Sequence, residues 1–132
     1  MKRLTKKWFE YAEANLEAAD VLLKSGRTHW SDQVCVYHCH QCIEKTLKTV
    51  IVEKEGEPKR THNLIVLLQD TEIQLSEEFK KYIEELNPHY QLPRYPDTPH
   101  KGPIFRYNKK VSKYHFDKTK KIFLWIKRSI LK

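Results

Sequence analysis

Apolar residues along this chain recur every three or four positions, which is the spacing of one face of an α-helix. The longest such patterns cover residues 4–24 and 32–55, and Gly26 and Gly56 follow them at positions suited to a helix end. The apolar stripe of the second pattern consists of Val36, Cys39, Ile43, Leu47 and Val50. We therefore expect two long helices, the second of them capped at its N-terminus by Ser31.

Three shorter helical patterns follow. The first covers residues 62–70, with Thr61 or Asn63 as its N-cap, the next begins at Ser76, and the last covers residues 109–131. No segment alternates apolar and polar residues for long enough to predict a β-strand. We therefore expect an all-α fold: an up-and-down bundle of four or five helices, with a proline-rich loop before the C-terminal helix.

This loop, residues 88–107, contains five of the six prolines in the chain. Proline fixes φ and biases the residue before it toward extended geometry, so the loop is expected to hold its side chains in place at low entropic cost. Among them are Arg94 and His100. A guanidinium binds two phosphate oxygens at once, and an imidazole can accept or donate a proton near neutral pH. The pair therefore suits phosphate chemistry, including RNA cleavage without a metal.

A polar stripe lies on the second long helix. Gln41, Glu44, Lys45 and Lys48 fall within an arc of roughly 100°, and His38 lies beside it. The stripe could face solvent, with Glu44 and Lys48 as an ordinary surface pair. It could also contact a partner subunit or the proline-rich loop.

Two other groups of residues could carry chemistry. Cys35, Cys39 and Cys42 share one helix face, but a single helix rarely supplies a tetrahedral metal site, so we expect them to pack as small hydrophobes. His62 is expected to bond locally at the start of a short helix. We therefore expect neither a metal nor a cofactor.

The net charge of +8 is concentrated near the C-terminus. Residues 108–132 hold nine lysines and arginines against one acidic residue, Asp117, whereas the preceding residues hold sixteen of each sign. Such an excess fits a solvated helix face, and it also fits a surface that attracts phosphate.

Length and composition narrow the class of protein. A chain of 132 residues fits one domain over residues 1–132. No apolar run is long enough to span a membrane, and no apolar core follows the basic N-terminus as it would in a signal peptide. Without an export signal, the three cysteines are expected to be reduced thiols in a cytoplasmic protein.

Several stretches together resemble the HEPN family (higher eukaryotes and prokaryotes nucleotide-binding), in its R-Y-P-D branch. The stretches are W-F-x-x-A-x-x-N-L-x-A-A from residue 8, Q-C-I-E-K-T-L-K from 41, T-H-N-L from 61 and Y-x-x-x-R-Y-P-D from 90. The resemblance implies a helical bundle that usually forms a homodimer and often works beside a minimal nucleotidyltransferase. Many members are ribonucleases with an Arg-x4–6-His motif near the dimer groove, a spacing that Arg94 and His100 satisfy.

Three functions remain open. The first is a nucleotide- or RNA-binding protein with a minimal nucleotidyltransferase partner, in a toxin–antitoxin or defence-like pair. Its binding residues would be Gln41, Glu44, Lys45, Lys48, Arg94, Tyr95 and Asp97. The second is a metal-independent endoribonuclease toxin with Arg94 and His100 as catalytic residues across a dimer groove. The third is a non-catalytic dimeric interaction module, so whether the protein is an enzyme stays open.

Overall fold

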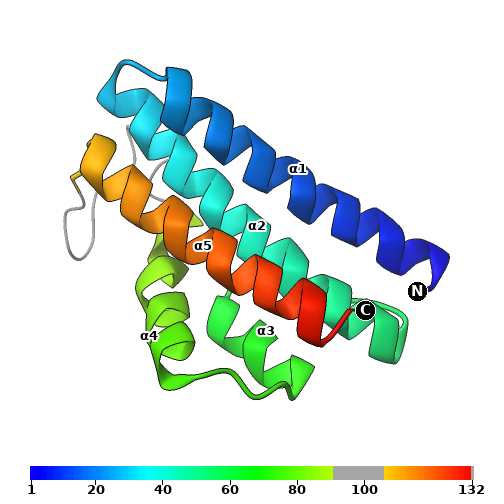
Figure 1. Ribbon diagram of the computed structural model, residues 1–132. Helices are drawn as coiled ribbons and strands as arrows, with labels where there is room; N and C mark the ends of the chain where they lie inside the picture. The colour runs from blue at the N-terminus through cyan, green and yellow to red at the C-terminus, as the bar shows by residue number, and fades with distance from the viewer. Residues whose placement is uncertain (91–105, 132) are drawn as a thin grey trace.

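The computed structural model describes residues 1–90 and 106–131, and this part of the chain is helical with no strands (Figure 1). The elements are α1 (Arg3–Ser25), α2 (His29–Glu55), α3 (Leu64–Thr71), α4 (Glu77–Leu86), the short 3-10 helix η1 (Asn87–Tyr90) and α5 (Lys109–Ser129). The prediction of an all-α helical bundle is confirmed. Arg94, Tyr95, Asp97 and His100 lie outside the described residues.

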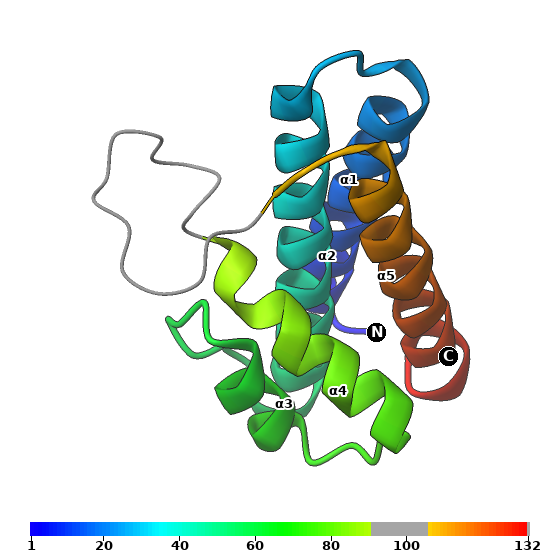
Figure 2. The same ribbon diagram turned by 90° about the vertical axis from the view of Figure 1, so that its left-hand side faces the viewer.

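Helix α2 is the central element of the bundle. It contacts α1, α5, α3 and η1. A short connection follows α1, and α2 then runs back along α1 (Figure 1). Figure 2 shows α3 and α4 together beside the C-terminal half of α2, with α5 on another side. Because neighbours cover α2 from several directions, polar residues on it become buried along with the apolar stripe.

The helix ends follow local hydrogen bonding. Asn63 caps α3, and Ser76 caps α4 by accepting from the Phe79 N–H, as the sequence predicts. The expected cap of α2 was wrong: the Thr28 side chain accepts from the Ser31 N–H, so the helix begins at residue 29 and not at 32. Both hydroxyls suit a cap, and the earlier one is used.

The C-terminal end of α2 depends on a glycine. Gly56 adopts the left-handed conformation, with φ of 92°, and donates its N–H to the Val52 carbonyl. This conformation strains any residue with a Cβ, so Gly56 ends the helix where the sequence predicts.

The core forms between the apolar stripes of the helices. The predicted α2 stripe is fully within it, and Leu64, Leu67, Ile83 and Ile122 reach it from the other helices. All three cysteines are free and buried, and they pack among apolar residues as the sequence predicts. None of the described helices combines the length and apolar character needed to cross a bilayer.

A second set of buried polar residues joins α4 and η1 to α5. The Tyr82 hydroxyl lies 2.9 Å from His115 Nδ1 and 3.1 Å from Thr119 Oγ1, and it donates to the His115 carbonyl at 3.0 Å. His89 Nδ1 lies 2.7 Å from the Tyr107 hydroxyl. These bonds satisfy polar groups that would otherwise make burial costly, and so they hold the short helices against α5.

Candidate functional site

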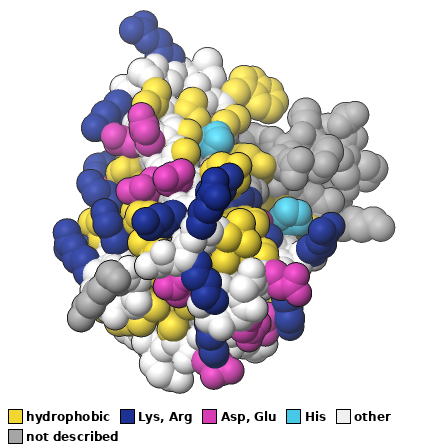
Figure 3. Space-filling view, turned by 90° about the vertical axis from the view of Figure 1, so that its right-hand side faces the viewer, with side chains coloured by type: hydrophobic (Ala, Val, Ile, Leu, Met, Phe, Trp, Pro, Cys, Tyr) yellow, Lys and Arg dark blue, Asp and Glu magenta, His cyan; other side chains and the backbone are white. Residues whose placement is uncertain are grey.

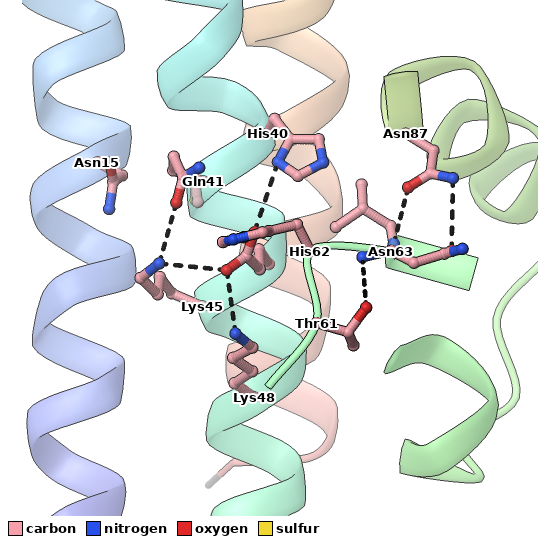
Figure 4. A network of polar contacts seen from close by, with 12 residues as sticks. Asn15, His40, Gln41, Lys45, Lys48, Thr61, His62, Asn63 and Asn87 are labelled. Carbon is pink, nitrogen blue, oxygen red and sulfur yellow. Dashed lines mark hydrogen bonds and ion pairs between the residues drawn. The ribbon is translucent and has the colours of Figure 1, made fainter. Parts of the chain in front are cut away.

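A cluster of polar side chains surrounds one carboxylate on α2. We call it the Glu44 network; its members are His40, Gln41, Glu44, Lys45, Lys48 and His62 (Figure 4). The Glu44 side chain is only 1% exposed. Lys48 donates to Glu44 Oε2 at 3.1 Å and Lys45 does so at 3.3 Å. The network therefore centres on a carboxylate that the fold has removed from water.

Helix geometry and one loop bring these residues together. Positions 41, 44, 45 and 48 share a face of α2, and Lys45 donates to Gln41 Oε1 at 2.9 Å. His62 comes from the loop before α3, and its Nδ1 lies 2.9 Å from Glu44 Oε1. The next residue, Asn63, caps α3, which holds this loop in position (Figure 4).

The charges around Glu44 outweigh the cost of burying it. Burial works to raise the pKa of this carboxyl, but the His62 hydrogen bond and the ammonium groups of Lys45 and Lys48 lower the pKa below its ordinary value. Glu44 is therefore an anion at neutral pH. Two ammonium groups share this single carboxylate, which leaves the network with surplus positive charge.

His40 is the most deeply buried member of the network. Its side chain is inaccessible to solvent, and Nδ1 lies 3.8 Å from Glu44 Oε1. Burial lowers the pKa of His40 to about 4, against weaker opposing contributions from Glu44 and the Asn87 backbone. His40 is therefore neutral at physiological pH.

Tyr90 connects the network to the next part of the chain. Its ring stacks on His62 with centroids 5.0 Å apart, and it lies 5.4 Å from the His40 ring. Residue 91 begins the segment that carries the predicted catalytic residues. The network therefore contacts the residue that directly precedes that segment in the chain.

The sequence-predicted site is thus found in part. Gln41, Glu44, Lys45 and Lys48 lie together, but Gln41, Glu44 and Lys48 are buried and only Lys45 is partly open to solvent. The His38 ring bonds instead to α1, where its Nδ1 lies 2.9 Å from Asn15 Oδ1.

Arg94 and His100, proposed for catalysis, fall outside residues 1–90 and 106–131, as do Tyr95 and Asp97, which are predicted to bind together with Arg94. His62 is a member that sequence reasoning did not find, since its partner is 18 positions away and nothing in the local sequence indicates the contact.

The basic C-terminal segment is partly engaged in contacts of the fold. Lys109 donates to the carbonyls of Leu23 and Gly26 at the end of α1, and Lys118 donates to Glu78 of α4. At the end of the bundle that carries both termini, Lys and Arg side chains are interspersed with acidic and apolar ones (Figure 3). On that face, the surface is mixed in character.

The fold agrees with the comparisons to known proteins. The HEPN domain model matches residues 5–129, and the chain therefore belongs to the HEPN domain family. The chain is 33% identical over 104 residues to “Putative toxin MJ1304” of Methanocaldococcus jannaschii, a match that covers 72% of this chain. It spans only 65% of that relative's length.

Two solved structures share the fold. TT1696 from Thermus thermophilus superimposes with a TM-score of 0.79 at 24% identity, over 96% of this chain and 98% of that one. ST0689, described as an archaeal HEPN homologue, has a TM-score of 0.71 at 25% identity, over 98% and 99% of the two chains. Both matches extend over nearly the whole bundle.

Proposed function

We propose that this HEPN protein binds the phosphates of a nucleotide or of RNA, and that it works with a minimal nucleotidyltransferase as a toxin–antitoxin or defence-like pair. The observation that supports binding is the charge of the Glu44 network, in which Lys45 and Lys48 share one carboxylate. Partly buried charges are stable only when they are paired, so the surplus ammonium charge favours an anion nearby.

Access to the network is uneven, and this decides which lysine meets the ligand. The Lys45 side chain is 20% exposed, whereas that of Lys48 is 8% exposed. Lys45 can therefore turn toward a phosphate while Lys48 keeps Glu44 paired. Arg94, Tyr95 and Asp97 complete the proposed binding set from the loop that follows Tyr90.

Isothermal titration calorimetry tests this proposal directly. ATP, GTP and a short RNA are titrated at low salt into the wild type, into Lys45→Gln and into Lys81→Gln. Lys81 is an exposed residue of α4 and serves as a control for the loss of one positive charge. Loss of one phosphate contact lowers affinity roughly 5- to 10-fold and reduces the salt dependence by about one unit of slope.

Two results would argue against phosphate binding. One is the absence of heat with every ligand at low salt, and the other is an equal effect of Lys45→Gln and Lys81→Gln. Urea unfolding of both variants shows whether a lost affinity reflects a lost fold.

A second candidate function is a metal-independent endoribonuclease, for which the toxin name of the Methanocaldococcus jannaschii relative is the support. In this proposal Arg94 stabilises charge on the phosphate and His100 acts as general acid or base. The test is incubation of a broad RNA panel with purified protein in EDTA, beside His100→Ala. Cleavage that His100→Ala abolishes supports the function, and an intact panel refutes it.

We also propose that the protein forms a homodimer and is located in the cytoplasm. Exposed apolar side chains on α1 and α2 would suit a contact with a second copy: Tyr11, Val21 and Val34. The three free, buried thiols are compatible with a reducing compartment. Light scattering of the purified protein separates a dimer from a monomer. A dimer that binds no phosphate and cleaves no RNA would favour the third function, a non-catalytic interaction module.

A further inference from the structure

A groove opens next to the Glu44 network, on the side of α1. Its volume is about 620 Å³, which is within the usual range for small-molecule sites. The groove is bounded by the start of α1, by Lys48 of α2 and by the loop of residues 57–62. Three segments that are far apart in the sequence therefore form its walls.

Trp8 supplies a large aromatic surface in this groove. Its ring centroid lies 5.7 Å from Lys48 Nζ and 6.0 Å from Lys45 Nζ, and the side chain is half-buried in α1. The half-exposed ring of His62 lines the groove as well. A stacking surface and two ammonium groups therefore lie within the span of a single nucleotide, whose base and phosphate are joined by one sugar.

The charge of the groove favours an anionic occupant. Lys48, Lys59 and Arg60 line it, against Glu57 as the acidic residue. Lys48 is already paired with Glu44 at 3.1 Å, and Lys59 is paired with Asp70 at 3.0 Å. Arg60 is exposed at the mouth, where a guanidinium can bind two phosphate oxygens at once.

We propose that this groove binds the base of a nucleotide or of one RNA residue, with Trp8 stacked on the base and with Arg60 and the more exposed Lys45 at the phosphates. The inference rests on the proposed phosphate binding and adds to it the part of the site that recognises the base. It places recognition on α1 and the loop of residues 57–62. An aromatic platform beside cationic side chains is a common way to bind single-stranded nucleic acid, because every base has a face that can stack.

The test compares ATP with inorganic tripolyphosphate, which carries the same phosphate chain without the nucleoside. Both are titrated into the wild type, Trp8→Leu, Trp8→Phe and Trp30→Leu at one ionic strength. Trp30 is an exposed tryptophan at the start of α2 and does not line the groove, so it is the matched control. Urea unfolding of each variant confirms that it is folded.

Stacking on Trp8 predicts that wild type binds ATP roughly 5- to 150-fold more tightly than tripolyphosphate. Trp8→Leu removes this advantage and leaves tripolyphosphate affinity unchanged, whereas Trp8→Phe retains part of it and Trp30→Leu retains it all. The inference is overturned if wild type binds the two ligands equally, or if Trp8→Leu keeps the preference for ATP. In both cases phosphate binding itself survives. If neither ATP nor tripolyphosphate binds, both the proposed base site and the proposed phosphate binding are overturned.

Discussion

Acid should begin to destabilise this protein above the pH at which carboxylates ordinarily titrate. His40, His89 and His115 are each at most 4% exposed. Burial lowers the pKa of His40 to about 4, of His89 to about 3 and of His115 to about 4, from an ordinary value of 6.5. Near pH 5 these three histidines are therefore neutral in the folded protein, whereas each of them binds a proton in the unfolded chain.

The sign and size of the effect follow from linkage. Above pH 6.5 these histidines are neutral in both states and do not change the unfolding free energy. As the pH drops from 6.5 toward the folded pKa, protons bind only to the unfolded chain, so the unfolding free energy falls. At pH 5 each of these histidines costs about 2 kcal/mol, so together they cost about 6 kcal/mol. A domain of this size has a net stability of only about 5–15 kcal/mol, so the loss at pH 5 removes a large part of it. Glu44, whose pKa is lowered, loses its contribution only at still lower pH.

Urea unfolding followed by circular dichroism between pH 7.5 and 5 measures this effect. The unfolding free energy of the wild type should fall by about 4 kcal/mol per pH unit near pH 5. His115→Asn, whose amide can replace Nδ1 as partner of Tyr82, should reduce that slope by about a third, because one of three titrating groups is removed. His29→Asn, at an exposed position, should leave the slope unchanged. A free energy that stays constant from pH 7.5 to 5, or equal slopes in all three proteins, would refute the reasoning.

Three further predictions concern stability and thiol chemistry. Glu44→Gln leaves two lysines without their carboxylate and should lower the unfolding free energy by about 3 kcal/mol. Adding Lys48→Met should restore part of this loss, and equal losses in the single and double mutants would contradict the prediction. Tyr82→Phe removes a hydroxyl that His115 and Thr119 both contact and should cost about 1–3 kcal/mol in urea unfolding, whereas loss of the exposed Tyr11 hydroxyl should cost almost nothing. The three buried cysteines should react with a thiol reagent such as DTNB only after denaturant is added, and rapid labelling of the native protein would show that the core is open.

The helices are the part of this protein that local sequence predicts well. The spacing of apolar residues on α2 defines its buried stripe, and Gly56 marks its end because only glycine adopts a left-handed backbone without strain. The local sequence does not decide the cap of α2, since Thr28 and Ser31 are both suitable and lie within one turn of each other. The choice between them depends on the short connection from α1.

The Glu44 network is predicted only in part, because periodicity reports which residues share a face and does not report what covers it. Gln41, Glu44, Lys45 and Lys48 have the spacing of an ordinary surface stripe, and on an isolated helix they would be solvated. In the folded protein most of this face of α2 is buried, and the loop before α3 brings His62 to Glu44.

The sequence by itself therefore determined the helical class, the apolar stripes and the spacing of the polar residues, because these follow from interactions within one or two helical turns. Tertiary structure decided which polar residues became buried, the contact between His62 and Glu44, and the position of Trp8 beside two lysines. These contacts join residues that are far apart in the chain. They form only when the helices pack, so no local pattern could indicate them.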